Sequence, residues 1–364
     1  MNIRVKKGTI AFVFVALFML GTSSVFAASL PLKTDVSKQQ RRVEAYKQIR
    51  NANPQGRLAF GDIERLYDGI LKDMVEARDE EFGTSLNQYI KAAFNGAKNG
   101  QDPQVAAQII DKTLKKAFYL TVKHELIEAI EEIEKTEEAH HKLDEAIVYY
   151  EVLASTVKEE DKQLNQHIIS GLKIARQAIK NKNLSKLKIA AQIVDKNIIN
   201  AFYDVILHEI KEVEEYASTN PAEAKIEKLE GLLYYQAIKG KVKTGNKIGN
   251  AVIEGMLKGP IDAVDYDVIA EELNRGFVAK VLHELEEVEE DWGEQEAIVK
   301  AWEGLLYYNI FQNDVKDKLG VKKAEELLVN LRQLTKATKS EDKGIAKELI
   351  EQIEDDIQSY FVQL

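Results

Sequence analysis

The sequence predicts an all-α protein made of tandem helical repeats, and three observations favour this class. Helix-forming Ala, Glu, Lys, Leu and Ile are abundant, while the 364 residues include only five prolines. No segment alternates between apolar and polar residues for long enough to require a β-strand. One pattern of residues recurs three times along the chain, which is the signature of a repeat architecture.

The recurring pattern consists of a long amphipathic segment followed by a second one. In the middle copy, Phe202, Ile206, Ile210 and Val213 form an apolar stripe at helical spacing. Two such helices joined by a short turn are expected to pack as an antiparallel hairpin, with an extra helix leading each unit. The long segments read AAQIIDKTLKKAFYLTVKHELIEAIEEIE (106–134), AAQIVDKNIINAFYDVILHEIKEVEEYA (190–217) and AEELNRGFVAKVLHELEEVEEDW (270–292); DEAIVYY, LEGLLYYQ and WEGLLYYN follow them.

Punctuating residues divide the chain into units of about three helices each. Asp102-Pro103 and Asn220-Pro221 place a capping side chain before a proline at the first helical position. The units are expected to stack or bundle in series. The expected segments are a degenerate leading unit at 61–86, repeats at 87–163, 164–245 and 246–320, and a C-terminal helical cap at 321–364.

The N-terminus has the features of a secretory signal peptide over residues 1–27. Arg4, Lys6 and Lys7 precede an apolar run, and cleavage is expected after Ala27. An uncleaved anchor is the alternative. The mature protein is therefore expected to be secreted or held at the cell surface, with no transmembrane span after cleavage.

Composition narrows the function classes. The chain has no cysteine, which excludes disulfides, thiolate zinc sites and thiol catalysis. A net charge of -10 argues against nucleic-acid binding and suits cations or basic partners. Residues 28–60 form a basic arm that is expected either to contact anionic wall polymer, lipid headgroups or the acidic body of another copy, or to be a solvated tail and first helix.

Each repeat carries a histidine and three glutamates at equivalent places. A His-Glu pair and a second glutamate lie on the long helix, and a further glutamate lies on the following helix. Because the histidine and the last glutamate are equidistant from the turn, their side chains are expected to meet across the hairpin. These candidate ligands are His124, Glu125, Glu128 and Glu145; His208, Glu209, Glu212 and Glu230; and His283, Glu284, Glu287 and Glu303.

A glutamate on the apolar face of a helix, such as Glu230, needs a partner because an isolated buried ion is costly. Lysine or arginine is not the aligned neighbour of such a glutamate in these units. The partners left are histidine, a tyrosine hydroxyl (Tyr149, Tyr234 or Tyr307), a shared proton or a metal ion. Nitrogen and oxygen donors together suit iron, manganese or zinc. A structural hydrogen-bond cluster and a solvated acidic face are the alternatives.

The signature Glu-Gly-x-x-Tyr-Tyr, at 230–235 and 303–308, resembles one in the low-iron-inducible iron-assimilation proteins. These are secreted or periplasmic helical-repeat proteins, and the resemblance implies iron binding near Glu230 and Glu303. It covers only a few residues per unit, and the first copy departs from it at Glu145-Ala146.

The sequence thus predicts a secreted metal-binding protein that captures, stores or delivers a metal ion, with iron favoured. The spacing HExxE lacks the second histidine of zinc peptidases, so proteolysis is not expected. A structural or adhesive, self-associating surface protein is the alternative, and a carboxylate-bridged oxidase is a third class.

Overall fold

The computed structural model describes residues 30–52 and 60–364. Within these ranges every regular element is helical, so the predicted all-α class is confirmed. The predicted signal peptide lies outside the described residues, as does the end of the predicted basic arm at 53–59. Across the described ranges, no helix is both long enough and apolar enough to cross a membrane.

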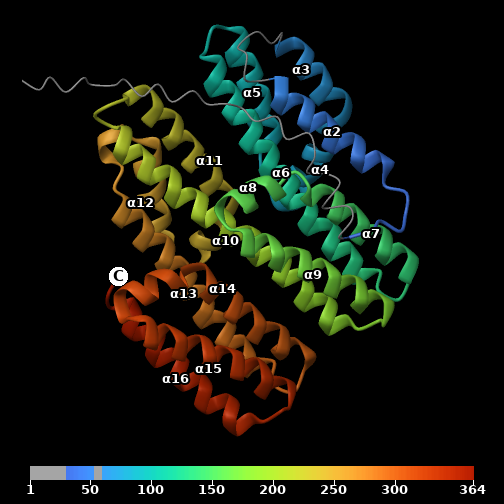
Figure 1. Ribbon diagram of the computed structural model, residues 1–364, viewed down its shortest axis with the longest axis vertical. Coiled ribbons are helices and arrows are strands. Elements are labelled where there is room, and N and C mark those ends of the chain that lie inside the picture. The colour runs from blue at the N-terminus through green and yellow to red at the C-terminus, as the bar shows by residue number, and fades with distance from the viewer. Residues whose placement is uncertain (1–29, 53–59) are drawn as a thin grey trace, which may run out of the picture. The chain divides into compact units, whose positions relative to one another are not determined.

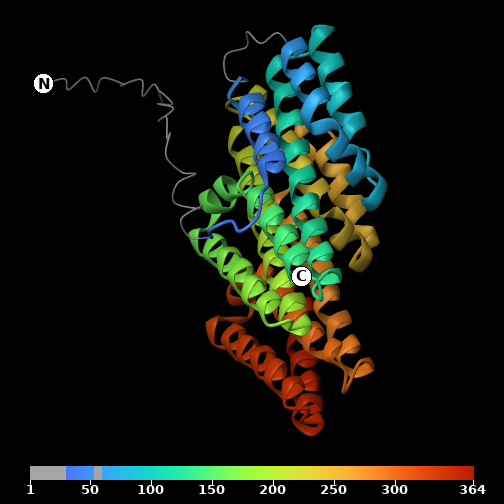
Figure 2. The same ribbon diagram turned by 90° about the vertical axis from the view of Figure 1, so that its right-hand side faces the viewer.

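The helices follow one another in three sets, each with a leading, a long and a following helix (Figures 1 and 2). We call these sets the first, second and third unit. The first unit comprises α5 (Leu86–Lys98), α6 (Pro103–Glu131) and α7 (Thr136–Tyr150), with the short α8 (Ala154–Glu160) after it. The second comprises α9 (Lys162–Lys180), α10 (Leu184–Tyr216) and α11 (Pro221–Gly245). The third comprises α12 (Lys247–Lys258), η3 (Ile261–Ala263), α13 (Tyr266–Glu290) and α14 (Gln295–Leu319).

Other helices lie before and after the three units. Four short elements precede them, in the region of the predicted degenerate unit and arm, and two helices follow at the predicted cap. They are α2 (Ser37–Ala52), α3 (Phe60–Leu66), η2 (Tyr67–Leu71) and α4 (Lys72–Phe82), then α15 (Val321–Lys339) and α16 (Lys343–Phe361).

The predicted helix starts are confirmed at two of the three long hairpins. The Asp102 side chain accepts a hydrogen bond from the backbone N–H of Gln104, and the Asn220 side chain accepts one from Glu223. Each cap satisfies a backbone donor that the first helical turn leaves unpaired. The long and following helices of each unit contact each other extensively, as expected for a hairpin.

Consecutive units are joined through a repeated aromatic contact in the core. A fully buried phenylalanine on each long helix lies between a tyrosine of the preceding helix set and the first tyrosine of its own following helix. Ring centroids are separated by 5.4 to 6.2 Å, within the range of favourable aromatic pairs. The three groups are Tyr46–Phe118–Tyr149, Tyr119–Phe202–Tyr234 and Tyr203–Phe277–Tyr307.

A second repeated contact fixes each following helix to the next leading helix. The second tyrosine of each Tyr-Tyr pair donates a hydrogen bond to the next leading helix, in two cases to a buried asparagine. Tyr67 of η2 makes an equivalent bond, in the segment that the sequence suggested was the tail of an earlier unit. The bonds are Tyr67 to Asn87 (2.8 Å), Tyr150 to Asn165 (3.0 Å), Tyr235 to Asn250 (2.9 Å) and Tyr308 to the Ala324 carbonyl (2.8 Å).

Helix α2, in the predicted basic arm, has one buried face and one exposed face. Helix α2 packs against α6, α7 and η2, and Tyr46 is 2% exposed. Arg42 donates to the Tyr149 hydroxyl at 2.7 Å, and Lys47 lies 3.6 Å from the Glu151 carboxylate. In this position α2 supplies the tyrosine that a preceding long helix supplies to the second and third units.

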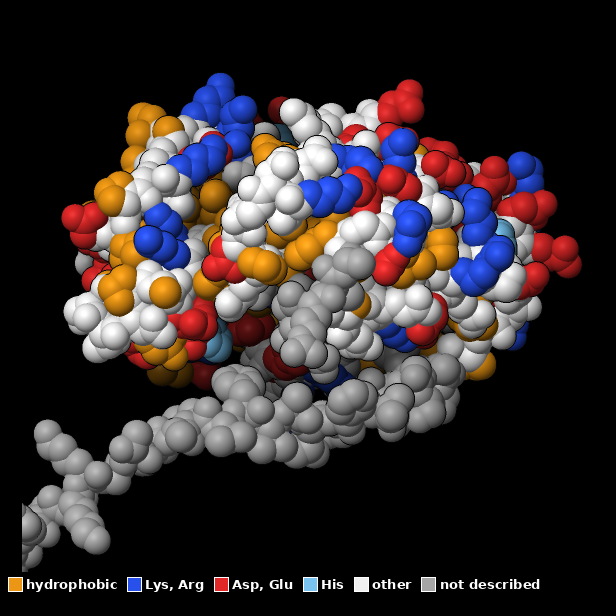
Figure 3. Space-filling model, turned by 90° about the horizontal axis from the view of Figure 1, so that it is seen from above, with side chains coloured by type: hydrophobic (Ala, Val, Ile, Leu, Met, Phe, Trp, Pro, Cys, Tyr) orange, Lys and Arg blue, Asp and Glu red, His pale blue; other side chains and the backbone are white. Residues whose placement is uncertain are grey.

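The charged side chains on the face drawn in Figure 3 are of mixed sign. Lysine and arginine are interspersed there with aspartate and glutamate, and hydrophobic side chains lie between them. Such mixing does not give a broad single-sign field on this face. A preference for a cation on this face would therefore come from a local cluster.

Candidate metal centre

The predicted carboxylates lie on the facing flanks of the long and following helices, and several are buried. Glu125, Glu145, Glu230 and Glu284 are each between 4% and 8% exposed. Carboxylates at this depth require partners, as the sequence suggested. The partners differ from those expected.

The three histidines do not meet the facing glutamates. His124 Nδ1 lies 2.9 Å from Glu81, which belongs to α4. The His208 side chain is 57% exposed and lies 3.6 Å from Glu160 and 3.7 Å from Glu212. In the third unit, His283 Nε2 lies 3.8 Å from Glu287 on its own helix. No ion pair within 4.0 Å joins these imidazoles to Glu145, Glu230 or Glu303 among the described residues, so the expected pairing across the hairpin is not formed.

Lysines contact the facing glutamates, which corrects the prediction that no lysine is aligned with them. Lys112 Nζ lies 2.9 Å from Glu230, and Lys196 Nζ lies 3.2 Å from Glu303. Both lysines project from the long helix of the preceding unit, because α6 contacts α11 and α10 contacts α14. The prediction missed this partner because it compared positions within one hairpin and not between neighbouring hairpins.

In the first and third units, a lysine of the following helix also contacts the acidic cluster. Lys142 Nζ lies 3.4 Å from Glu125 and 3.7 Å from both Glu128 and Glu145. Lys300 Nζ occupies the same place in the third unit, at 3.6 Å from Glu284 and 3.3 Å from Glu287. Each lysine lies three residues before the facing glutamate. In the first unit the ammonium group thus bridges carboxylates from both helices of the hairpin, whereas in the third it contacts two carboxylates of the long helix.

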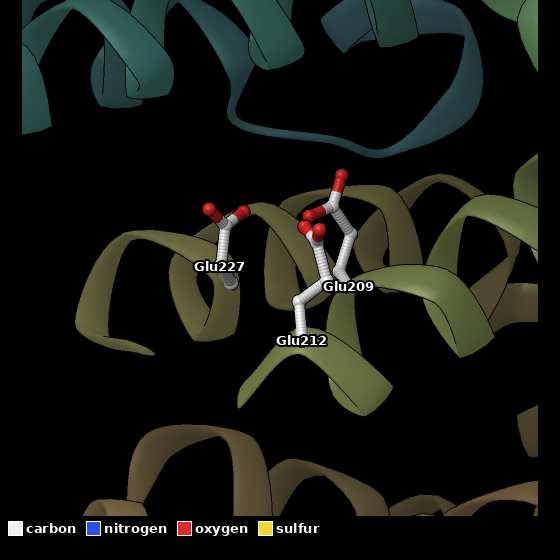
Figure 4. A group of neighbouring side chains, drawn as sticks. All are labelled: Glu209, Glu212 and Glu227. Carbon is white, nitrogen blue, oxygen red and sulfur yellow. The ribbon is translucent and has the colours of Figure 1, made fainter. Parts of the chain in front are cut away.

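The second unit has a glutamate at this position. Glu227, three residues before Glu230, replaces the lysine, and its carboxylate joins those of Glu209 and Glu212. One oxygen of each of these three lies within 4.8 Å of the others. Figure 4 shows that Glu209 and Glu212 project from α10 and Glu227 from α11, with the three carboxylates pointing toward the same side of the helix pair. We call Glu209, Glu212 and Glu227 the triglutamate cluster.

The dimensions of the triglutamate cluster suit a metal ion. One oxygen from each carboxylate is close enough to the other two for a single cation to contact all three. Lys112 neutralises Glu230 at the edge of the cluster. The lysine that contacts the carboxylates of the first and third units is replaced by Glu227 in the second unit. The three carboxyl groups of the cluster therefore lie in a half-buried seam without a bridging ammonium group from the described part of the chain.

Crowding perturbs the protonation of these carboxyl groups. Burial, a hydrogen bond with Glu227 and the charge of Glu230 raise the pKa of Glu209 to about 10. Burial raises the pKa of Glu227 to about 7, and Glu230 and Glu212 contribute. The metal-free cluster thus retains protons at neutral pH, since three adjacent carboxylates cannot all ionise cheaply. Protons and a metal ion compete for the same oxygens.

This competition predicts the pH dependence of the metal-free protein. An unfolded glutamate ionises near pH 4.3, so between about pH 5 and pH 7 the folded chain holds protons that the unfolded chain has released. The free energy of unfolding should therefore fall as the pH rises through this window. In Glu209→Gln the fall should be smaller, because glutamine needs no proton. Urea unfolding at pH 5, 6 and 7 measures both slopes.

Glu215→Gln is the matched control, because Glu215 is exposed on the same helix and outside the cluster. Its slope should equal that of the unaltered protein. Equal slopes for all three proteins would contradict the protonation of Glu209.

Comparisons with protein-family models, with curated proteins and with solved structures find no match to this chain. The geometry of the chain itself must therefore support any function.

One sequence signal could have revealed the lysines that cross between units. The dipeptide Asp-Lys occurs at the same place in the first two long helices, at 111–112 and 195–196.

Proposed function

We propose that this protein is an extracytoplasmic metal-binding protein that captures, stores or delivers a metal ion at the triglutamate cluster. One observation carries the proposal. Equivalent clusters in the first and third units are bridged by the ammonium groups of Lys142 and Lys300, and the second unit has Glu227 at that position. A bound cation takes the role of the lysine and offsets the additional carboxylate.

The donors limit the metals that this site would take. Carboxylate oxygens favour hard cations, and the metal centres of many helical bundles are built from glutamates on facing helices. Manganese and iron therefore fit better than zinc, which prefers nitrogen and sulfur donors. His208, 3.7 Å from Glu212, borders the cluster and is the nitrogen donor available to an ion that requires one. The resemblance at Glu230 favours iron.

Access and location are consistent with a carrier role. Glu209, Glu212 and Glu227 are half-buried, so an ion reaches them without unfolding of the core. Export rests on the predicted signal peptide at residues 1–27. A carrier needs only reversible binding, and protons that compete for the same oxygens provide a means of release at lower pH.

Metal stoichiometry tests the proposal. Titration of the mature protein with Mn²⁺, Fe²⁺, Fe³⁺ and Zn²⁺, followed by calorimetry and elemental analysis, should give one ion per chain. Glu227→Lys should weaken binding about 100-fold or more, because it places an ammonium group at the ion's position. Glu215→Lys changes the net charge equally but lies outside the cluster, and should retain binding.

The reciprocal exchange sharpens the test. Lys300→Glu gives the third unit the arrangement of the second, with Lys196 contacting Glu303 as Lys112 contacts Glu230. It should create a second saturable site. The proposal would be wrong if the unaltered protein bound no ion, or bound three, or if Glu227→Lys left the affinity unchanged.

The alternative, a structural or adhesive protein that associates through its basic N-terminal segment, is less well supported. Arg42 and Lys47 of that segment contact Tyr149 and Glu151 of the same chain. These two cations are occupied within the molecule, and the exposed Lys38 and Arg41 of α2 are available to a partner.

A further inference from the structure

A cavity of about 140 Å³ lies where the three units meet. Helices α6 and α10 form its walls, α11 contributes Lys241, and α14 contributes Glu303. The cavity is separate from the triglutamate cluster, whose residues do not line it. Its volume is close to that of the engineered protein cavity of about 150 Å³ that holds one benzene molecule.

One part of the cavity wall is apolar. Val122, Leu126, Ile127 and Ile130 of α6 line it, together with Val194 of α10. Ile127 is 37% exposed, so this side reaches the protein surface. A wall of this kind favours an apolar group of matching size over water.

A closed polar network forms another part of the wall. The Tyr119 hydroxyl donates to Asp195 at 2.8 Å, and Lys196 Nζ lies 3.0 Å from Asp195 and 3.2 Å from Glu303. These four side chains satisfy one another. Few of their polar atoms are therefore free to bind a ligand.

Two further lysines line the cavity without a carboxylate partner. No aspartate or glutamate oxygen of the described residues lies within 4.0 Å of the ammonium group of Lys123 or Lys241. Their charges nevertheless reach the cavity. Although burial alone would raise the pKa of Asp195, the charges of Lys196, then Lys123 and Lys241, hold it below its ordinary value. The Lys123 ammonium group also lies 5.9 Å from the centroid of the Phe82 ring. With three lysines and two carboxylates in its wall, the cavity has one excess positive charge in a chain of net charge -10.

We infer that this cavity binds a small organic anion, a monocarboxylate with an aromatic or branched apolar body. The apolar body contacts Val122, Leu126 and Ile130, and the carboxylate lies between the ammonium groups of Lys123 and Lys241. Charge-assisted hydrogen bonds of this type are about twice as strong as neutral ones. This inference is independent of metal binding, since the two sites share no residue.

Fluorine NMR with 4-fluorobenzoate as the probe tests the inference on the full-length mature protein. We expect saturable binding of one molecule per chain. Lys241→Met and Lys123→Met should each weaken it about tenfold, because each removes one charge-assisted contact. Lys243→Met is the matched control, since Lys243 is exposed on the same helix as Lys241, and should not change the affinity.

Two further measurements distinguish binding in the cavity from adsorption of the probe elsewhere on the protein surface. Ile130→Trp fills the cavity without removing a charge and should abolish binding, while circular dichroism checks that the variant is folded. Neutral 4-fluorobenzamide should bind at least about tenfold more weakly than the acid. The inference would be overturned by lack of saturable binding, by equal affinity for the amide, or by affinity that neither Lys241→Met nor Ile130→Trp alters.

Discussion

Replacement of Lys196 by methionine is expected to lower the free energy of unfolding by about 3–5 kcal/mol, the usual cost of removing one partner from a buried ion pair. Lys196 is 2% exposed, and its ammonium group contacts Asp195, Glu303 and the Gln192 side chain. It also lies 4.8 Å from the ring centroid of Tyr307. Methionine preserves most of the side-chain volume, so the loss of stability comes mainly from the two carboxylates that are left without a cation.

The pH dependence of this loss identifies its cause. Lys196 is the largest of the charges that lower the pKa of Asp195, so without its ammonium group this pKa rises and the folded variant binds a proton more readily than its unfolded chain. The difference between variant and unaltered protein should therefore shrink as the pH falls below about 5. Urea unfolding at pH 4.5 and pH 7 measures it. Lys211→Met, on the exposed side of the same helix, should cost less than about 0.5 kcal/mol.

Local sequence signals were sufficient to predict the helices. Proline after a capping side chain gave the starts of α6 and α11, and the apolar stripe that includes Phe202 gave the buried face of α10. These signals involve residues within one turn or one helix face. They do not specify which helices of different units become neighbours.

The candidate centre was predicted only in part for that reason. The sequence grouped Glu125, Glu209 and Glu284 with other glutamates of the same hairpin as candidate ligands, and the structure places them near those carboxylates. The expected histidine partners point elsewhere, because a histidine adjacent to each of these glutamates is rotated by about 100° around the helix. His124 contacts Glu81 of α4, and the side chains of His208 and His283 are exposed.

The rest of the candidate site is determined by contacts between units, which local sequence signals do not predict. Lys112 reaches Glu230 over a sequence separation that no periodicity describes, and the polar bond from Tyr203 to Asn274 likewise joins two long helices. Comparing the units position by position would have shown that Glu227 stands where Lys142 and Lys300 stand. That one exchange distinguishes the second unit, and only the packed structure shows that it removes a bridging cation.

Phe202→Ala is expected to be as damaging as the loss of Lys196, at about 3–5 kcal/mol. The Phe202 side chain is fully buried, and its ring lies 5.6 Å from that of Tyr119 and 5.4 Å from that of Tyr234. Truncation leaves a cavity in the contact that joins the first unit to the second. Ile248→Ala, at a position 79% exposed, is the control and should cost less than about 0.5 kcal/mol.

The shape of the unfolding transition adds a second readout. In stacked helical units, stability comes from each unit and from the contacts between neighbours, so a weakened junction uncouples what lies on either side. Phe202→Ala should therefore broaden the denaturant transition or split it in two, whereas a loss confined to one unit would shift it without broadening. A loss below about 1 kcal/mol with an unchanged slope would show that the aromatic contact does not couple the units.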